Sequence, residues 1–226
     1  MNRDLAVCRT MLDVLVAPDA AFHALDARPN FGSAVLCFGA LSAVTLLAQS
    51  ALLEPALRQD PLRADLPAGA AIGKAPWFAL RLIVATVAGL GVVMRGMAFG
   101  SLLHALALTS GGRGSWRHSV ALVVHLEIVF LLEAMCLLGL LVLERPETWE
   151  DARTLQLRAG LDLLHSSSDP TLRAAFAAVN AFTVWWGVLL VRGVARLMHI
   201  SWSRAAALAL PLWSVAVLLR FFLQPR

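Results

Sequence analysis

The stretch VVHLEIVFLLEAMCLL, residues 123–138, places His125, Glu127 and Glu133 within a run of apolar residues. Carboxylates and imidazoles are the side chains that most often transfer protons in enzymes and carriers. At membrane depth such residues are rare, and they usually face a partner, a cavity or a substrate. These three residues are therefore the first candidates for a functional site.

Known catalytic motifs are absent. The sequence contains no HExxH, GxSxG or GxxxxGK[ST] pattern and no zinc-spaced set of Cys and His. The tripeptide HLE at 125–127 matches half of the zinc deaminase signature, but the PCxxC half is missing. We therefore expect no enzyme activity, metal or cofactor. An intramembrane hydrolase that uses His125, Glu127 and Glu133 is the weakest alternative left open.

The composition is that of a membrane protein. Of 226 residues 59% are hydrophobic and 15% charged, and the mean hydropathy is +0.72. A net charge of +4 does not indicate nucleic acid, because the basic residues are scattered and flank apolar runs. Only Lys74 among the 19 basic residues is a lysine, and with the many alanines this favours a bacterial source. The expected partners are the lipid bilayer and other membrane proteins.

The apolar runs are long enough to cross a bilayer as helices. We predict an all-α integral membrane protein with a transmembrane domain over 32–226 and five spans, at about 32–53, 79–108, 119–143, 174–198 and 205–223. Asp169 as N-cap and Pro170 at the first helical position are expected to open the fourth span.

Two further segments are predicted to be amphipathic surface helices. Residues 1–31 carry Leu5, Leu12 and Leu15 at helical spacing, followed after Pro18 by a short helix that Asp19 is expected to cap. The loop between spans three and four, 144–173, holds a predicted capping box at Thr148 and a helix to about residue 165.

Orientation follows from the short turns. The turns after spans two and four contain arginines and no acid, whereas loop 144–173 begins with acids. Short basic loops stay on the cytoplasmic side. We therefore expect a multi-pass protein of the bacterial cytoplasmic (inner) membrane with its N-terminus in the cytoplasm.

Depth arithmetic predicts an ion pair. If spans two and three form a tight hairpin, residues whose numbers add to roughly 227 lie at similar depth. Arg95 and Glu133 meet this condition, and each charge alone would cost about 3 kcal/mol in the membrane. We predict that they pair, whether to fix helix register or to serve a proton pathway.

His104 and His125 share a depth nearer the cytoplasm by the same arithmetic. Glu127 could reach His104 or a partner that the sequence does not identify. The three residues are candidates for a polar pathway, although hydrogen-bonded interhelical histidines are the more common case. Arg192, Arg196 and Arg220 are expected to extend to lipid headgroups, and Arg81 either to do the same or to meet Glu144.

Span two has a face of small residues. Gly96 and Gly100 form GxxxG beside Arg95, and Gly89 precedes them. Small residues let membrane helices approach closely, so these three glycines are expected to support the hairpin.

Two stretches carry a family resemblance. APDAAFHALDARP, with Pro18, Phe22, Leu25 and Pro29, resembles the entry to the first span of the Ypt/Rab-interacting protein (YIP) domain family. VNAFTVWWGVLLVRGVARLMHISWSRA resembles its fourth span and following turn through Asn180, Phe182 and Trp185. The resemblance implies a bacterial-type member with five spans and no assigned enzyme activity.

The expected function is therefore non-enzymatic. We expect a polytopic protein of the YIP type that organises or assembles membrane components, with an accessory subunit of a transporter as one form of that role. The alternative is a proton-linked transporter or channel that uses the intramembrane Arg, Glu and His residues.

Overall fold

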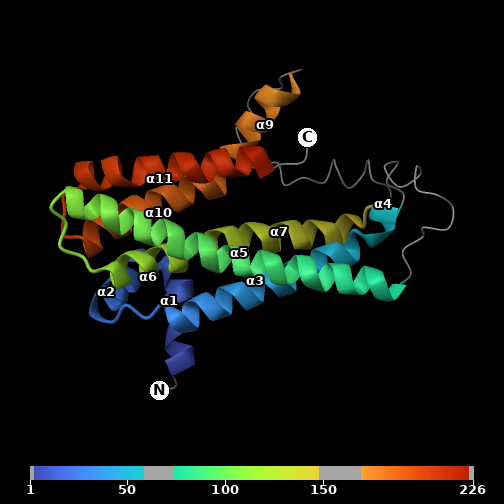
Figure 1. Cartoon of the computed structure of the whole chain (residues 1–226), viewed down its shortest axis with the longest axis horizontal. Coiled ribbons are helices and arrows are strands. Elements are labelled where there is room, and N and C mark those ends of the chain that lie inside the picture. The colour runs from blue at the N-terminus through green and yellow to red at the C-terminus, as the bar shows by residue number, and fades with distance from the viewer. Residues whose placement is uncertain (1–2, 59–73, 148–168, 224–226) are drawn as a thin grey trace. The chain divides into compact units, whose positions relative to one another are not determined.

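The computed structural model describes residues 3–58, 74–147 and 169–223, and the part described contains helices and no strand. Figure 1 shows the helices in chain order. Their bounds are α1 Arg3–Val16, α2 Pro18–Ala27, α3 Gly32–Leu52, α4 Glu54–Arg58, α5 Lys74–Thr109, α6 Trp116–Leu126, α7 Ile128–Glu144, α9 Pro170–Ala178, α10 Ala181–Leu197 and α11 Trp202–Leu223.

Four helical stretches among the described residues are long and apolar enough to cross a membrane. They are Gly32–Leu52, Phe78–Thr109, Trp116–Glu144 and Trp202–Phe222, and they correspond to predicted spans one, two, three and five. The prediction of an all-helical chain with several membrane spans is thus confirmed.

The fourth predicted span is not one helix. The chain breaks between α9 and α10 at Val179 and Asn180. The Asn180 side chain accepts from the Thr183 backbone N–H (2.8 Å), and the Thr183 hydroxyl accepts from the Asn180 N–H (2.9 Å). This reciprocal capping box starts a new helix. The prediction of a continuous helix over 174–198 was wrong because it followed the apolar run and ignored this cap. With 17 residues, α10 has about the minimum length of a helix that crosses a bilayer.

Asn180 is buried, so its loss should be measurable. We expect Asn180→Ala to lower the free energy of unfolding by about 1 kcal/mol, because the first turn of α10 loses a side-chain acceptor. Detergent-solubilised protein unfolded with a denaturing surfactant would give this value. Asn30→Ala, at an exposed position before α3, is the matched control and should change it by less than about 0.5 kcal/mol. Equal effects at the two positions would contradict the cap.

The N-terminal helices pack on protein. The expected cap of α2 was misplaced: Ala17 occupies the N-cap, Pro18 the first turn, and Asp19 follows inside the helix. Phe22 and Leu25 are buried, and α2 contacts both α6 and α10. That α1 lies on a membrane surface stays a prediction.

The expected helix from Thr148 to about residue 165 lies outside the described residues. Asp169 caps α9 as predicted, since its side chain accepts a hydrogen bond from the Thr171 N–H at 2.8 Å.

The chain divides into two compact units. Of the described residues, the first comprises 3–38, 93–130 and 169–223, and the second comprises 39–58, 74–92 and 131–147. The core of the first unit contains the indole of Trp186 and aliphatic side chains of α6, α10 and α11, such as Leu122, Leu190 and Leu212. In Figure 1, α10 and α11 run side by side.

The second unit has contacts of its own. The backbone of α5 at Gly89 comes so close to α3 that a Cβ on Gly89 would lie 2.7 Å from the Gly39 carbonyl oxygen. The Gln49 side chain donates to the Ala134 carbonyl oxygen (2.7 Å). Arg81 pairs with Glu54 at 2.5 Å, a partner that the sequence did not indicate, and its expected contact with a headgroup or with Glu144 stays a prediction.

Candidate functional site

Glu127 lies at the break between α6 and α7. Its backbone N–H donates to the carbonyl of Val124 (3.2 Å), three residues back, instead of continuing the α-helical pattern. The side chain is only 3% exposed. The break, which occurs without proline, therefore presents a carboxylate to the interior of the first unit.

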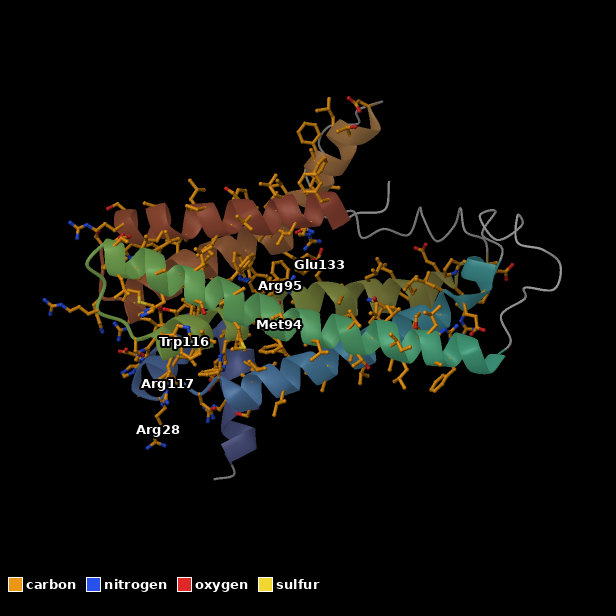
Figure 2. The ribbon with its side chains drawn as sticks, in the orientation of Figure 1. Arg28, Met94, Arg95, Trp116, Arg117 and Glu133 are labelled. Carbon is orange, nitrogen blue, oxygen red and sulfur yellow. The ribbon has the colours of Figure 1, made fainter. Side chains whose placement is uncertain are left out.

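The partner of Glu127 is Arg95 on α5. Arg95 Nε donates to Oε1 (3.2 Å), and Nη2 donates to Oε2. Such a two-pronged contact between guanidinium and carboxylate is the strongest form of this ion pair. The carboxylate is buried, whereas the Arg95 side chain is 35% exposed. Figure 2 shows Arg95 on its helix. Glu127, for which the sequence identifies no certain partner, is thus held by a two-pronged ion pair with Arg95.

An aromatic ring lies beside this pair. The Arg95 guanidinium carbon lies 5.0 Å from the centroid of Phe130, and that of Arg220 lies 5.7 Å from the same centroid. Phe130 stacks in turn on Trp186, with 5.7 Å between centroids. Cation–π contacts of this kind stabilise guanidinium groups away from water. The site is therefore a charged cluster, which we define as Arg95, Glu127, Phe130 and Arg220.

Close packing of α5 on α6 brings the pair together. A Cβ on Gly96 would lie 2.9 Å from Val124 Cγ2, and one on Gly100 would lie 2.6 Å from Val120 Cα. Both distances are shorter than ordinary van der Waals contact. The two glycines thus leave room for the backbone of α6, which is what the GxxxG pattern favours.

The register of this contact differs from the expected one. In a tight hairpin Gly96 would lie level with about residue 131. It lies instead against Val124, about seven residues nearer to the start of α6. The cause is the loop 110–115, which runs back along α5: the Trp116 indole N–H donates to Ser101 Oγ at 2.9 Å. Arg95 consequently meets Glu127. Glu133 belongs to the second unit, so its pairing with Arg95 stays a prediction.

The two candidate histidines are not joined to Glu127 by a hydrogen bond among the described residues. His125 is buried, and its Nδ1 donates to the Ala121 carbonyl oxygen (2.7 Å) within its own helix. His104 Nδ1 is buried without a hydrogen-bond partner in the described part of the chain. No group of three or more His, Cys, Asp or Glu that could hold a metal ion occurs among the residues the structure describes.

The residues that carried the family resemblance have structural positions in the first unit. Pro18 starts α2 and Pro29 follows its end, while Phe22 and Leu25 form its buried face. Asn180 caps α10, and Phe182 and Trp185 of that helix pack against the core.

Two arginine contacts were not expected from the sequence. Arg192 pairs with Asp19 of α2, at 2.8 and 2.5 Å. Arg220 lies over Phe130. One signal was available: Phe130 follows Glu127 by three residues, a spacing that puts two side chains on one face of a helix.

A family model confirms the resemblance. The model described as the Yip1 domain matches residues 12–223, nearly the whole chain. No curated protein and no solved structure matches the chain. With several helices that can cross a bilayer, this chain is a multi-pass membrane protein that belongs to the Yip1 domain family.

Proposed function

We propose that this protein is a non-enzymatic organiser of other membrane proteins in a bacterial cytoplasmic membrane, and that a transporter is the assembly it serves. In this proposal α10 is a fifth crossing and the N-terminus lies in the cytoplasm. The charged cluster then has a structural role. It holds α5, the α6–α7 break and α11 together, and so keeps the α5–α6 loop and the α10–α11 turn in a fixed conformation.

The observation that carries the proposal is a basic edge, which we define as Arg28, Arg113 and Arg117. All three side chains are exposed, and none has an acidic partner among the described residues. Figure 2 shows Arg28 and Arg117 extending outward at this edge. Charges left exposed and unpaired are suited to bind an acidic surface.

The basic edge is held in place by hydrogen bonds. The Arg113 N–H donates to the Met198 carbonyl oxygen (3.2 Å), which ties the α5–α6 loop to the end of α10. His118 Nε2 contacts the Asp26 carbonyl oxygen (3.1 Å), which ties the start of α6 to α2. Because these bonds already order the backbone at this surface, binding of a partner costs less conformational entropy.

A photo-crosslinking amino acid at position 28 or 117 tests this proposal in cells. We expect one adduct of discrete mass with another membrane protein, because the edge presents its charges to that partner. The crosslinker at Leu218, which is exposed on α11, is the control and should give no such adduct. With the crosslinker at position 28, the double variant Arg113→Gln, Arg117→Gln should lose the adduct while its abundance stays normal. An adduct that persists in this double variant would contradict the proposal.

The second candidate is a proton-linked carrier, favoured by one observation: a buried carboxylate within the candidate span Trp116–Glu144. Vesicles that contain the purified protein and an internal pH dye separate the two functions. An organiser gives no proton flux above protein-free vesicles. A flux that disappears in Glu127→Gln, with the variant still folded, would establish the carrier and reject the organiser.

A further inference from the structure

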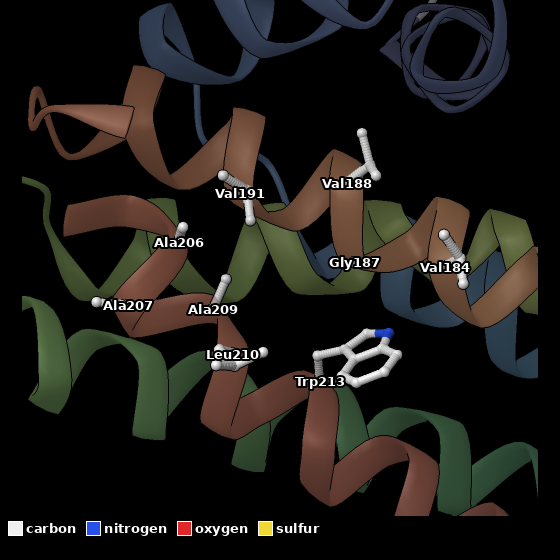
Figure 3. Close-up of a pocket in the computed structure, with 9 residues that line it drawn as sticks. All are labelled: Val184, Gly187, Val188, Val191, Ala206, Ala207, Ala209, Leu210 and Trp213. Atoms are coloured by element: carbon white, nitrogen blue, oxygen red, sulfur yellow. The ribbon is translucent and has the colours of Figure 1, made fainter. Parts of the chain in front are cut away.

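An apolar groove runs between α10 and α11. Its volume is about 400 Å³, within the range of small-molecule sites. It is lined by Val184, Gly187, Val188, Val191, Ala206, Ala207, Ala209, Leu210 and Trp213. Figure 3 shows these residues on the two helices. Val188 and Leu210 are 56% and 60% exposed, so nothing in the described chain covers the groove.

The groove has a built floor. The Trp213 indole extends toward α10 and occupies the place of a side chain at Gly187, where a Cβ would lie 2.6 Å from the ring. The indole N–H donates to the Thr183 carbonyl oxygen at 2.9 Å. Because the indole N–H is already hydrogen-bonded, the ring offers no free polar atom to an occupant. The lining of the groove is therefore apolar.

The depth of the groove matches one leaflet. The indole of Trp202 is exposed at the start of α11, and exposed tryptophans at helix ends mark the membrane interface. Ala206 lies about 6 Å and Trp213 about 16 Å further along the helix. The hydrocarbon core is about 30 Å thick, so the groove extends from below the headgroups to the bilayer midplane. A transmembrane helix of a partner would need a longer contact.

Two arginines lie at the ends of α10 and α11, beyond the shallow end of the groove. Arg196 in the last turn of α10 and Arg204 in the first turn of α11 are exposed, and neither has an acidic partner among the described residues. The hydroxyls of Ser201 and Ser203 lie 3.2 Å apart in the same turn. Arginine and hydroxyl groups are common ligands of phosphate oxygens.

We propose that this groove binds one anionic phospholipid, with an acyl chain between α10 and α11 and the phosphate at Arg196 and Arg204. Charge, depth and apolar lining each fit this occupant. The site is independent of the basic edge and of the proposed function, because none of its residues belongs to either.

Native mass spectrometry of protein released from nanodiscs tests the proposal. The nanodiscs contain equal amounts of phosphatidylglycerol and phosphatidylcholine with identical acyl chains. We expect the protein to retain phosphatidylglycerol several-fold more than phosphatidylcholine. Equal retention of the two lipids, or release mainly as a dimer whose formation depends on the groove, would overturn the proposal.

Two variants separate the chain site from the headgroup site. Ala206→Phe, at an exposed lining position, should fill the groove and lower retention of both lipids several-fold. Leu218→Phe on the same helix is the control and should behave as wild type. Arg196→Gln with Arg204→Gln should bring the two lipids to equal retention without lowering that of phosphatidylcholine. Melting temperatures report whether each variant folds, and an Ala206→Phe protein that folds and retains lipid like wild type would overturn the proposal.

Discussion

Replacement of Arg95 by alanine is expected to lower the free energy of unfolding by about 3–5 kcal/mol. The carboxylate of Glu127 is buried, and Arg95 supplies both of its described hydrogen bonds. Without the guanidinium, a charge would remain in the interior of the unit with no partner. Unfolding by a denaturing surfactant in mixed micelles measures the change, and a lower amount of protein in the membrane should accompany it.

Two controls isolate the role of the pair. Arg113→Ala removes an exposed arginine outside the charged cluster and should change the stability by less than about 0.5 kcal/mol. Arg95→Leu combined with Glu127→Leu removes both charges and should destabilise much less than Arg95→Ala alone, because no unpaired charge is left. A double variant as unstable as Arg95→Ala would contradict an ionic origin of the effect.

A double-mutant cycle then compares the two acids. Arg95→Ala is measured in backgrounds that carry Glu127→Gln or Glu133→Gln, and the coupling energy is obtained for each pair. We expect the larger coupling with Glu127, to which the structure joins Arg95. A larger coupling with Glu133 would show that the pairing predicted from sequence is the dominant one.

The helices of this chain could be predicted from the sequence because apolar run length determines where a chain can cross a bilayer. The cap at Asp169 was equally readable, since Pro170 follows it. The break before α10 was also present in the sequence, as Asn180 with Thr183 three residues on. Within an apolar run of more than 20 residues such a break is easily overlooked, because the mean hydropathy of the run changes little when it contains two polar capping residues.

The partner of Arg95 could not be predicted in the same way. Six residues, 110–115, connect α5 and α6, and a loop of that length can either turn at once or run back along the helix. Only tertiary contacts decide, here those of Trp116 with Ser101 and of Arg113 with Met198. The depth arithmetic assumed a tight hairpin, whereas this loop shifts the register of α6 along α5. The structure pairs Arg95 with Glu127, and the pairing of Arg95 with Glu133 stays a prediction.

Replacement of Gly100 by alanine is expected to lower the free energy of unfolding by about 1–3 kcal/mol, although it adds a single methyl group. The new Cβ would lie 2.6 Å from Val120 Cα, and a backbone atom cannot rotate away as a side chain can. Helix α6 would have to move from α5. Thermal unfolding of the detergent-solubilised protein measures the loss.

The same helix offers a matched control for this effect. Gly91 has no atom within 4 Å of where its Cβ would be, so Gly91→Ala should leave the stability unchanged or raise it by as much as about 1 kcal/mol. Because Gly100 holds α6 at the distance that Arg95 and Glu127 require, the two perturbations should not add: Gly100→Ala should cost less in an Arg95→Ala background. Full additivity would mean that the close helix contact and the ion pair stabilise the first unit independently, contrary to the view that the glycines bring the charges together.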